Sequence, residues 1–365
     1  MTRASCSGAI VTLRIRGRSA ASGGTRGPGG STRQLYRAAV RRVQAVRIRI
    51  VDAFTDRAFA GNPAAVCLLE EDGWPDDAWM QQLAAELNMP MTAFVLTRAD
   101  GDWGLRWFTP RIEERLCGHA TLATAFLLHG DGLGGATMRF HTMGGVLPAT
   151  VSDDGTVTLD FPAATVAPRG AIEGLAEALG AEPTQLFGTG TLRDVLAVFD
   201  DEATVRALAP RFDALAELSR REDIRCVTAT ARAAAGAEHD FVSRFFSPAD
   251  GIPEDPVTGS AHCALAPFWA QRLGGTRLVG RQLSERGGVV RTELAGDRVL
   301  LSGRAVTVLD GDGADRRGDG GASRQRAPAA CGPRQAGSAP ARRPAAQAPA
   351  EPAAGARMTG IQPEL

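Results

Sequence analysis

The chain has 365 residues, enough for two domains of ordinary size, and its 41 arginines balance 41 acidic residues. The balance hides an acidic middle, because residues 50–310 hold 22 Arg against 36 Asp and Glu; this argues against nucleic acid as the main partner, since phosphate binding needs a basic face. The sequence has no lysine, which excludes Schiff-base chemistry, a lysine-anchored pyridoxal phosphate and a P-loop.

The six cysteines lie far apart and form no C-x-x-C pair, a pattern typical of free thiols in a reducing compartment. No stretch approaches the roughly 18 consecutive apolar residues of a membrane span. We therefore expect a cytoplasmic protein without membrane association.

The two ends of the chain differ in composition from its middle. Residues 1–45 are rich in Arg, Ser and Gly without acids; they predict a disordered basic extension or translation from too early a start, although they also resemble an organellar transit peptide. Residues 311–365 are dominated by Ala, Pro, Gly and Arg. Because such a segment cannot bury enough apolar surface to offset its ordering entropy, we expect a disordered tail.

Residues 46–165 predict alternating strands and helices, separated by turn residues. The expected strands are Val46–Phe54, Ala64–Leu69, Thr92–Thr97, Trp103–Phe108, Val146–Ser152 and Thr156–Phe161, and the expected helices are Asp76–Leu87 and Ala120–Leu128. The second helix is apolar on nearly all sides, which favours a buried position.

A linker is expected at residues 162–170, and residues 166–310 then repeat the theme. The expected elements are a helix at Ile172–Leu179, strands at Val195–Phe199, Cys226–Thr230 and Asp240–Phe246, a buried helix at Ala261–Leu273 and a meander through Val289–Val308. The sequence therefore predicts an α+β fold of two similar domains, 46–165 and 166–310, with a cleft between them.

Two turns preceding the apolar helices share one character. Leu116-Cys117-Gly118-His119 and Val257-Thr258-Gly259-Ser260 each place a glycine at a predicted helix start. A glycine lets the backbone approach a ligand, and the helix start behind it offers unpaired N–H groups. Two such turns facing one cleft favour an enzyme that acts on a small carboxylic acid.

Further motifs occur in a fixed order over about residues 47–310: Val51–Phe54, Gly61–Ala64, Trp107–Pro110, Leu116–Thr121, Asp240–Phe246, Gly251-Ile252, Glu254–His262, Gln282, Ser284, Arg286–Gly288 and Gly303–Val306. Together they resemble the phenazine biosynthesis PhzF-like family, which shares the diaminopimelate epimerase fold. The resemblance implies two domains, each a curled β-sheet or barrel around a central helix. It also implies a homodimer that isomerises or epimerises small carboxylic acids by proton transfer, without metal or organic cofactor.

The resemblance assigns roles to six residues. His119 and Asp255 would transfer protons, Gly118, Gly259 and Ser260 would hold the substrate carboxylate, and Asn62 would shape the pocket. Taken alone, His119 also fits a satisfied core histidine, and Asp255 also fits a helix-capping acid.

Met91 stands where the family pattern has its principal acid/base, a glutamate just before Thr-Ala-Phe. Methionine cannot carry a proton, and losing a general base costs about 10²–10⁴-fold in rate. Three explanations are open. Another group (His119, Asp255, Glu113 or Glu114) takes over the proton transfer, or the protein binds its ligand without turnover, or Met91 is a sequence anomaly.

Cys117 is a further candidate. The related epimerases use two thiols as an acid/base pair, but the second thiol position is Thr258 here, so a two-base racemase is not expected. We expect Cys117 to be a small buried apolar residue. The alternative is a thiolate whose pKa the helix N-terminus lowers.

Overall fold

The computed structural model describes residues 46–69 and 73–312, which belong to one compact unit. The predictions for residues 1–45 and for the tail beyond residue 312 lie outside the described residues. The division into domains at residues 165 and 166 stays a prediction.

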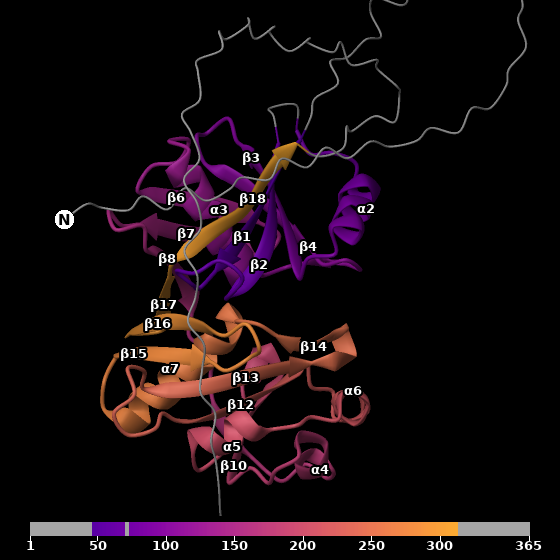
Figure 1. Cartoon of the computed structure of the whole chain (residues 1–365), viewed down its shortest axis with the longest axis vertical. Coiled ribbons are helices and arrows are strands. Elements are labelled where there is room, and N and C mark those ends of the chain that lie inside the picture. The colour runs from indigo at the N-terminus through magenta and orange to yellow at the C-terminus, as the bar shows by residue number, and fades with distance from the viewer. Residues whose placement is uncertain (1–45, 70–72, 313–365) are drawn as a thin grey trace, which may run out of the picture. The chain divides into compact units, whose positions relative to one another are not determined.

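The described strands are all linked by hydrogen bonds in one sheet (Figure 1). They are β1 (Arg47–Ala53), β2 (Asn62–Leu68), β3 (Met91–Thr97), β4 (Trp103–Phe108), β5 (Glu113–Glu114), β6 (Thr137–Thr142), β7 (Gly145–Val151), β8 (Val157–Pro162), β9 (Ala167–Arg169), β10 (Gln185–Gly188), β11 (Asp194–Val198), β12 (Cys226–Arg232), β13 (Phe241–Ser247), β14 (Ile252–Asp255), β15 (Arg277–Gln282), β16 (Gly288–Ala295), β17 (Arg298–Gly303) and β18 (Ala305–Asp312).

The helices are α2 (Asp77–Leu87), α3 (Gly118–Gly130), α4 (Leu175–Leu179), α5 (Glu202–Ala207), α6 (Phe212–Arg221) and α7 (Gly259–Leu273), with short 3₁₀ turns η1 (Gly190–Leu192) and η2 (Pro248–Asp250). Helix α2 begins where the sequence predicts, because the Asp76 side chain accepts hydrogen bonds from the N–H groups of Ala78 and Trp79.

Helix α3 is the centre of the first half of the chain. Its hydrophobic residues point in all directions, and it packs against β1, β2, β3, β7, β8 and β18 (Figure 1). A helix that is apolar all round is stable only when it is enclosed. The curled sheet provides that enclosure, with large buried side chains such as Trp107, Phe140 and Phe161.

Helix α7 has the same place in the second half, where it packs against β15, β16 and β17. Strands from distant parts of the sequence close the structure. Strand β17 pairs with β8, and β18 returns to pair with β1, with Ile50 opposite Leu309. As a result, the apolar cluster around α3 also includes Val257, Val299 and Leu301.

Most predicted elements are present, with three differences. The expected linker contains a short strand, β9, which pairs with β10. The helix expected at Ile172 begins at Leu175, because Gly174 before it has a left-handed backbone with φ of 82°. The structure also contains elements that the sequence did not predict, namely β5, β6, β10, β14, β15, α5 and α6.

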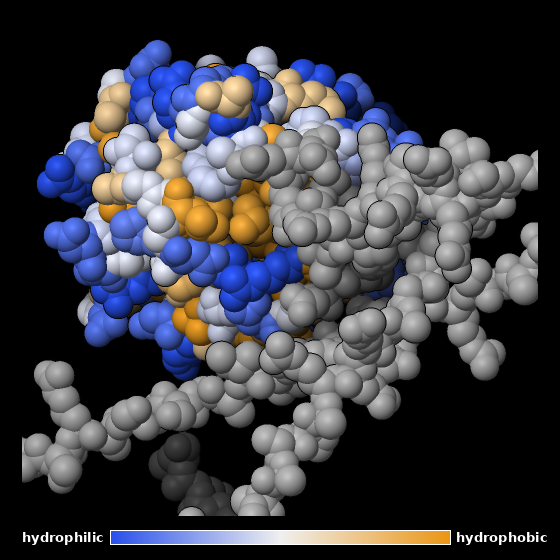
Figure 2. Space-filling view, turned by 90° about the horizontal axis from the view of Figure 1, so that it is seen from above, coloured by the Kyte–Doolittle hydropathy of each residue, from blue (hydrophilic) through white to orange (hydrophobic). Residues whose placement is uncertain are grey.

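The surface carries polar residues with scattered apolar ones. Figure 2 shows one face, with hydrophilic residues around its edge and an apolar area near its centre. The large apolar side chains that are exposed are Phe59, Trp74, Ile112, Leu116, Leu133, Met143 and Val146. Among the described residues, no helix is both long and apolar enough to cross a membrane.

Candidate active site

The two predicted glycine turns meet in the structure. Helix α3 begins at Gly118 and α7 begins at Gly259, and a Cβ atom built on either glycine would lie 3.3 Å from the Cα atom of the other. A larger residue at either position would therefore separate the helix starts. Neither N-cap residue, Cys117 or Thr258, caps its helix through a side-chain hydrogen bond. Helix starts without such a cap can bind an anion through their first-turn N–H groups.

Asp255 lies at the end of β14, directly before this meeting point. The Asn62 amide donates to Asp255 Oδ1 at 2.8 Å and to the carbonyl of Val257 at 2.8 Å, while the Thr258 hydroxyl donates to Asp255 Oδ2. Asp255 is 8 % exposed, and burial raises its pKa to about 6, against the two hydrogen bonds that favour the carboxylate. Asp255 therefore titrates near neutral pH, as a general acid or base requires. It does not cap α7, contrary to the alternative interpretation.

Gln282 holds the turn that carries Asp255. Its Nε2 donates to the Asp255 carbonyl at 2.7 Å, and its Oε1 accepts from the Thr258 N–H at 2.8 Å. Gln282 is fully buried. The sequence predicts Gln282 only as part of the family pattern; its role in holding this turn depends on contacts between distant segments that no local signal in the strand RLVGRQ reveals.

His119 is buried in the first turn of α3. Its Nδ1 lies 3.5 Å from the Cys117 sulfur, and its Nε2 has no hydrogen-bond partner among the described residues. Burial lowers the pKa of His119 to about 3, so the ring is neutral at physiological pH. A buried, unpartnered ring nitrogen can exchange a hydrogen bond or a proton with a ligand.

Cys117 is buried, as expected, but the alternative of a reactive thiolate is wrong. Burial raises the pKa of its thiol, and the carboxyl groups of Asp255 and Glu114 raise it further. The N–H groups of His119 and Ala120 act in the opposite direction but do not outweigh the loss of hydration.

Met91 begins β3 and lies opposite Ala64 of β2. It is 6 % exposed and belongs to the same apolar cluster as Cys117 and Val257. Position 91 thus holds a packed apolar side chain.

The two nearby glutamates differ in availability. Glu113 forms a bidentate ion pair with Arg106 at 2.7 and 2.6 Å. Glu114 is partly buried, and its pKa is raised by burial and by Asp250, while Arg225 opposes this shift. Of the two, Glu114 is the carboxyl that is free to take up a proton.

The predicted residues are brought together in two linked pairs, Asn62 with Asp255 and Gly118 with Gly259. His119 and Ser260 each follow one of these glycines, and Ser260 is partly buried. The described residues thus gather the proposed carboxylate holders and the proposed proton carriers around two helix N-termini.

One group of side chains has ligand atoms close enough for a metal ion, namely Asp100, Asp102 and His141. Arg98 pairs with Asp100 at 3.2 Å and Arg139 pairs with Asp102 at 3.2 Å. These arginines already compensate both carboxylates, and the group contains none of the candidate site residues.

Comparison with known proteins assigns the sequence to a family. Residues 51–311 match the family model described as "Phenazine biosynthesis-like protein". The chain belongs to the phenazine biosynthesis-like family. This assignment confirms the resemblance, and the matched span covers both glycine turns and all the candidate site residues.

Relatives in the phenazine biosynthesis-like family support the fold and the enzyme class. A protein of Pseudomonas aeruginosa named an uncharacterized isomerase is 48% identical over 262 residues, covering 72% of this chain and 96% of that protein. The crystal structure of a PhzF-family phenazine biosynthesis protein from Enterococcus faecalis matches with a TM-score of 0.68 and 38% identity, covering 74% of this chain and 100% of that one. A predicted epimerase from Pseudomonas aeruginosa has the same fold, with a TM-score of 0.58 and 22% identity, covering 73% and 98% of the two chains. The predicted α+β epimerase-like fold is therefore confirmed.

Proposed function

We propose that the chain is a cofactor-independent isomerase or epimerase that moves a proton on a small carboxylic acid. The observation that carries the proposal is the meeting of two uncapped helix N-termini beside a buried carboxyl whose pKa is about 6. The isomerase names of relatives support the same reaction class. A homodimer in the cytoplasm remains part of the proposal.

The N–H groups at Gly118, Gly259 and Ser260 would hold the substrate carboxylate. A fixed set of donors also stabilises the negative charge that develops when a proton leaves the carbon next to that carboxylate. Because both residues are glycines that lie close together, neither contributes a side chain that would block these N–H donors.

Asp255 would remove or return the carbon-bound proton. Asn62 and Thr258 hold its two oxygens, so the carboxylate keeps one orientation. His119, neutral and with Nε2 unpartnered, would carry the proton to a second position. The net change is the transfer of one proton, without any change in oxidation state.

A catalytically silent small-acid binding protein is the second candidate, and Met91 favours it. The apolar side chain of Met91 fills the position of the family's acid/base and packs in the core. Binding by the two helix starts does not need that acid, whereas turnover by the family's route does.

Solvent deuterium exchange distinguishes the two candidates. The wild type is incubated in D₂O with amino- and hydroxy-substituted small carboxylic acids, and exchange into each acid is followed by NMR. The variants are His119→Ala, Asp255→Asn and Met91→Glu, with Met91→Gln as the control of matched size that cannot carry a proton.

Exchange by the wild type that is lost in His119→Ala or Asp255→Asn supports the isomerase. Exchange that appears only in Met91→Glu, with ligand binding by the wild type, rejects catalysis and supports the binding protein. Equal gains in Met91→Glu and Met91→Gln would show that the size of residue 91, and not its carboxyl, controls the reaction.

A further inference from the structure

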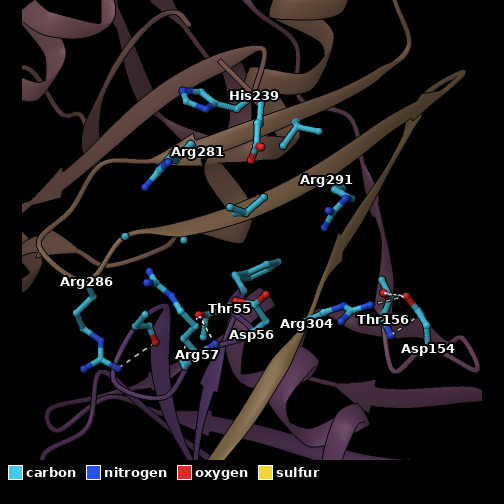
Figure 3. A pocket seen from close by; sticks show the side chains of 17 residues that line it. Thr55, Asp56, Arg57, Asp154, Thr156, His239, Arg281, Arg286, Arg291 and Arg304 are labelled. Atoms are coloured by element: carbon cyan, nitrogen blue, oxygen red, sulfur yellow. Dashed lines mark hydrogen bonds and ion pairs between the residues drawn. The ribbon is translucent and has the colours of Figure 1, made fainter. Parts of the chain in front are cut away.

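One cavity, whose lining includes neither His119 nor Asp255, is rich in arginine. It has a volume of about 680 Å³, and five arginines and three carboxyl residues contribute to its lining. This volume lies in the range of small-molecule sites. Figure 3 shows Arg281 and Arg291 extending from strands of the second half of the chain, and Arg57 rising from the first half.

The guanidinium groups of three of these arginines have no partner among the described residues. Arg286 is held by Asp52 at 2.7 Å and Arg304 by Asp154 at 2.9 Å. In contrast, the side chains of Arg57, Arg281 and Arg291 form no hydrogen bond or ion pair with any described residue. Guanidinium groups that face a cavity and are not paired with a carboxylate are suited to bind phosphate or carboxylate oxygens.

The strand register explains why two of the arginines lie close together. On β15 and β16, Val279 is opposite Arg291 and Val289 is opposite Arg281, so the two arginines are diagonal neighbours on one face. The preceding arginine on this face, Arg277, is opposite Glu293 and pairs with it at 3.0 Å. The sheet therefore neutralises one arginine and leaves the side chains of the next two unpaired.

The wall of the cavity that faces β15 and β16 is the loop between β1 and β2, which has a strained backbone and is held by hydrogen bonds. Phe54 and Phe59 at its ends have positive φ values of 61° and 66°, which non-glycine residues seldom adopt. Arg286 clamps the loop by donating to the carbonyl of Gly61 at 2.8 Å and to that of Ala60 at 3.1 Å. Backbone strain of this kind persists where surrounding contacts hold it, and it gathers at ligand sites.

We propose that this cavity binds a small molecule through an oxyanion group, a phosphate or a carboxylate, held by Arg57, Arg281 and Arg291. The overall charge strengthens the case, because these unpaired cations lie in a segment of 22 Arg against 36 acidic residues. A local basic site in an acidic protein attracts a small anion while the surrounding negative charge repels nucleic acid. The inference goes beyond the proposed isomerase and does not depend on it.

Calorimetric titration of the full chain with inorganic phosphate and with succinate, at constant ionic strength, tests the proposal. The variants are Arg281→Gln and Arg291→Gln, singly and together, and both positions are exposed. Arg277→Gln is the control, since it removes an equal charge from the same face of β15 but breaks only the pair with Glu293.

The site predicts that at least one probe binds the wild type and that the double variant binds it at least tenfold more weakly, because two charged hydrogen-bond donors are lost. The control should bind like the wild type. The stronger of the two probes identifies a phosphate or a carboxylate as the preferred group. No binding by either anion at millimolar concentration, or equal weakening in Arg277→Gln, would overturn the assignment.

Discussion

The buried carboxyl of Asp255 should make the protein less stable as the pH rises, and Asp255→Asn should remove that effect. Burial raises the pKa of Asp255 from 3.8 to about 6. A carboxyl whose pKa is higher in the folded state stabilises the fold when it is protonated. This contribution is fully present below pH 3.8 and is lost as the pH rises through about 6.

The magnitude follows from the shift in pKa. A difference of about 2.2 units at about 1.36 kcal/mol per unit makes ionised Asp255 cost about 3 kcal/mol of folding free energy. About 2 kcal/mol of this cost develops between about pH 4.5 and 7.5. The asparagine side chain keeps an oxygen for the Asn62 amide and presents an NH₂ group to the Thr258 hydroxyl, which can turn to accept it.

The assay is urea unfolding of both proteins across this pH range. The stability of Asp255→Asn minus that of the wild type should increase by about 2 kcal/mol from about pH 4.5 to 7.5. The histidines His119 and His262, with pKa values lowered to about 3 and 4 by burial, titrate in both proteins and cancel in the difference. Parallel stability curves would refute the raised pKa of Asp255 and, with it, the idea that this carboxyl is poised for proton transfer.

Two further outcomes test the backbone and the thiol. Gly61→Ala should lower the free energy of unfolding by about 3 kcal/mol or more, since its Cβ would lie close to the Ala53 carbonyl at a φ of +66°. Gly155→Ala, with a φ of +80° and nothing within 4 Å, should cost only about 1 kcal/mol, and equal urea midpoints for the two variants would contradict the clash. Cys117 should resist iodoacetamide in the native protein and react after denaturation, because burial raises the pKa of its thiol; peptide mass spectrometry after mild alkylation would disprove this by finding Cys117 labelled.

The helix starts were predictable because their signals are local. Gly118 and Gly259 each precede an apolar run, and the structure begins a helix at both residues. That the two glycines touch was not predictable from spacing, since 140 intervening residues fold between them. The pattern of elements predicted two similar domains with a cleft between them, and the resemblance to a known family added the roles of individual residues.

Long-range pairing marks the limit of the sequence prediction. Strand β18 pairs with β1 although Ile50 and its partner Leu309 lie at opposite ends of the folded region. Nothing in the alternation of either strand names its partner, because many strands share that pattern. The arginine cavity was missed for the same reason: Arg281 and Arg291 become neighbours only through the register of β15 and β16, and Arg57 joins them from the first half.

Met91 takes no part in the hydrogen bonds that hold Asp255. The hydrogen bonds that hold Asp255 come from Asn62 and Thr258, and the turn behind it is held by Gln282. None of these contacts involves residue 91, which contributes apolar packing at the start of β3. Substitution at position 91 therefore removes none of these hydrogen-bonding partners. For this reason, a comparison of Met91→Glu with Met91→Gln isolates the contribution of a single carboxyl group to turnover.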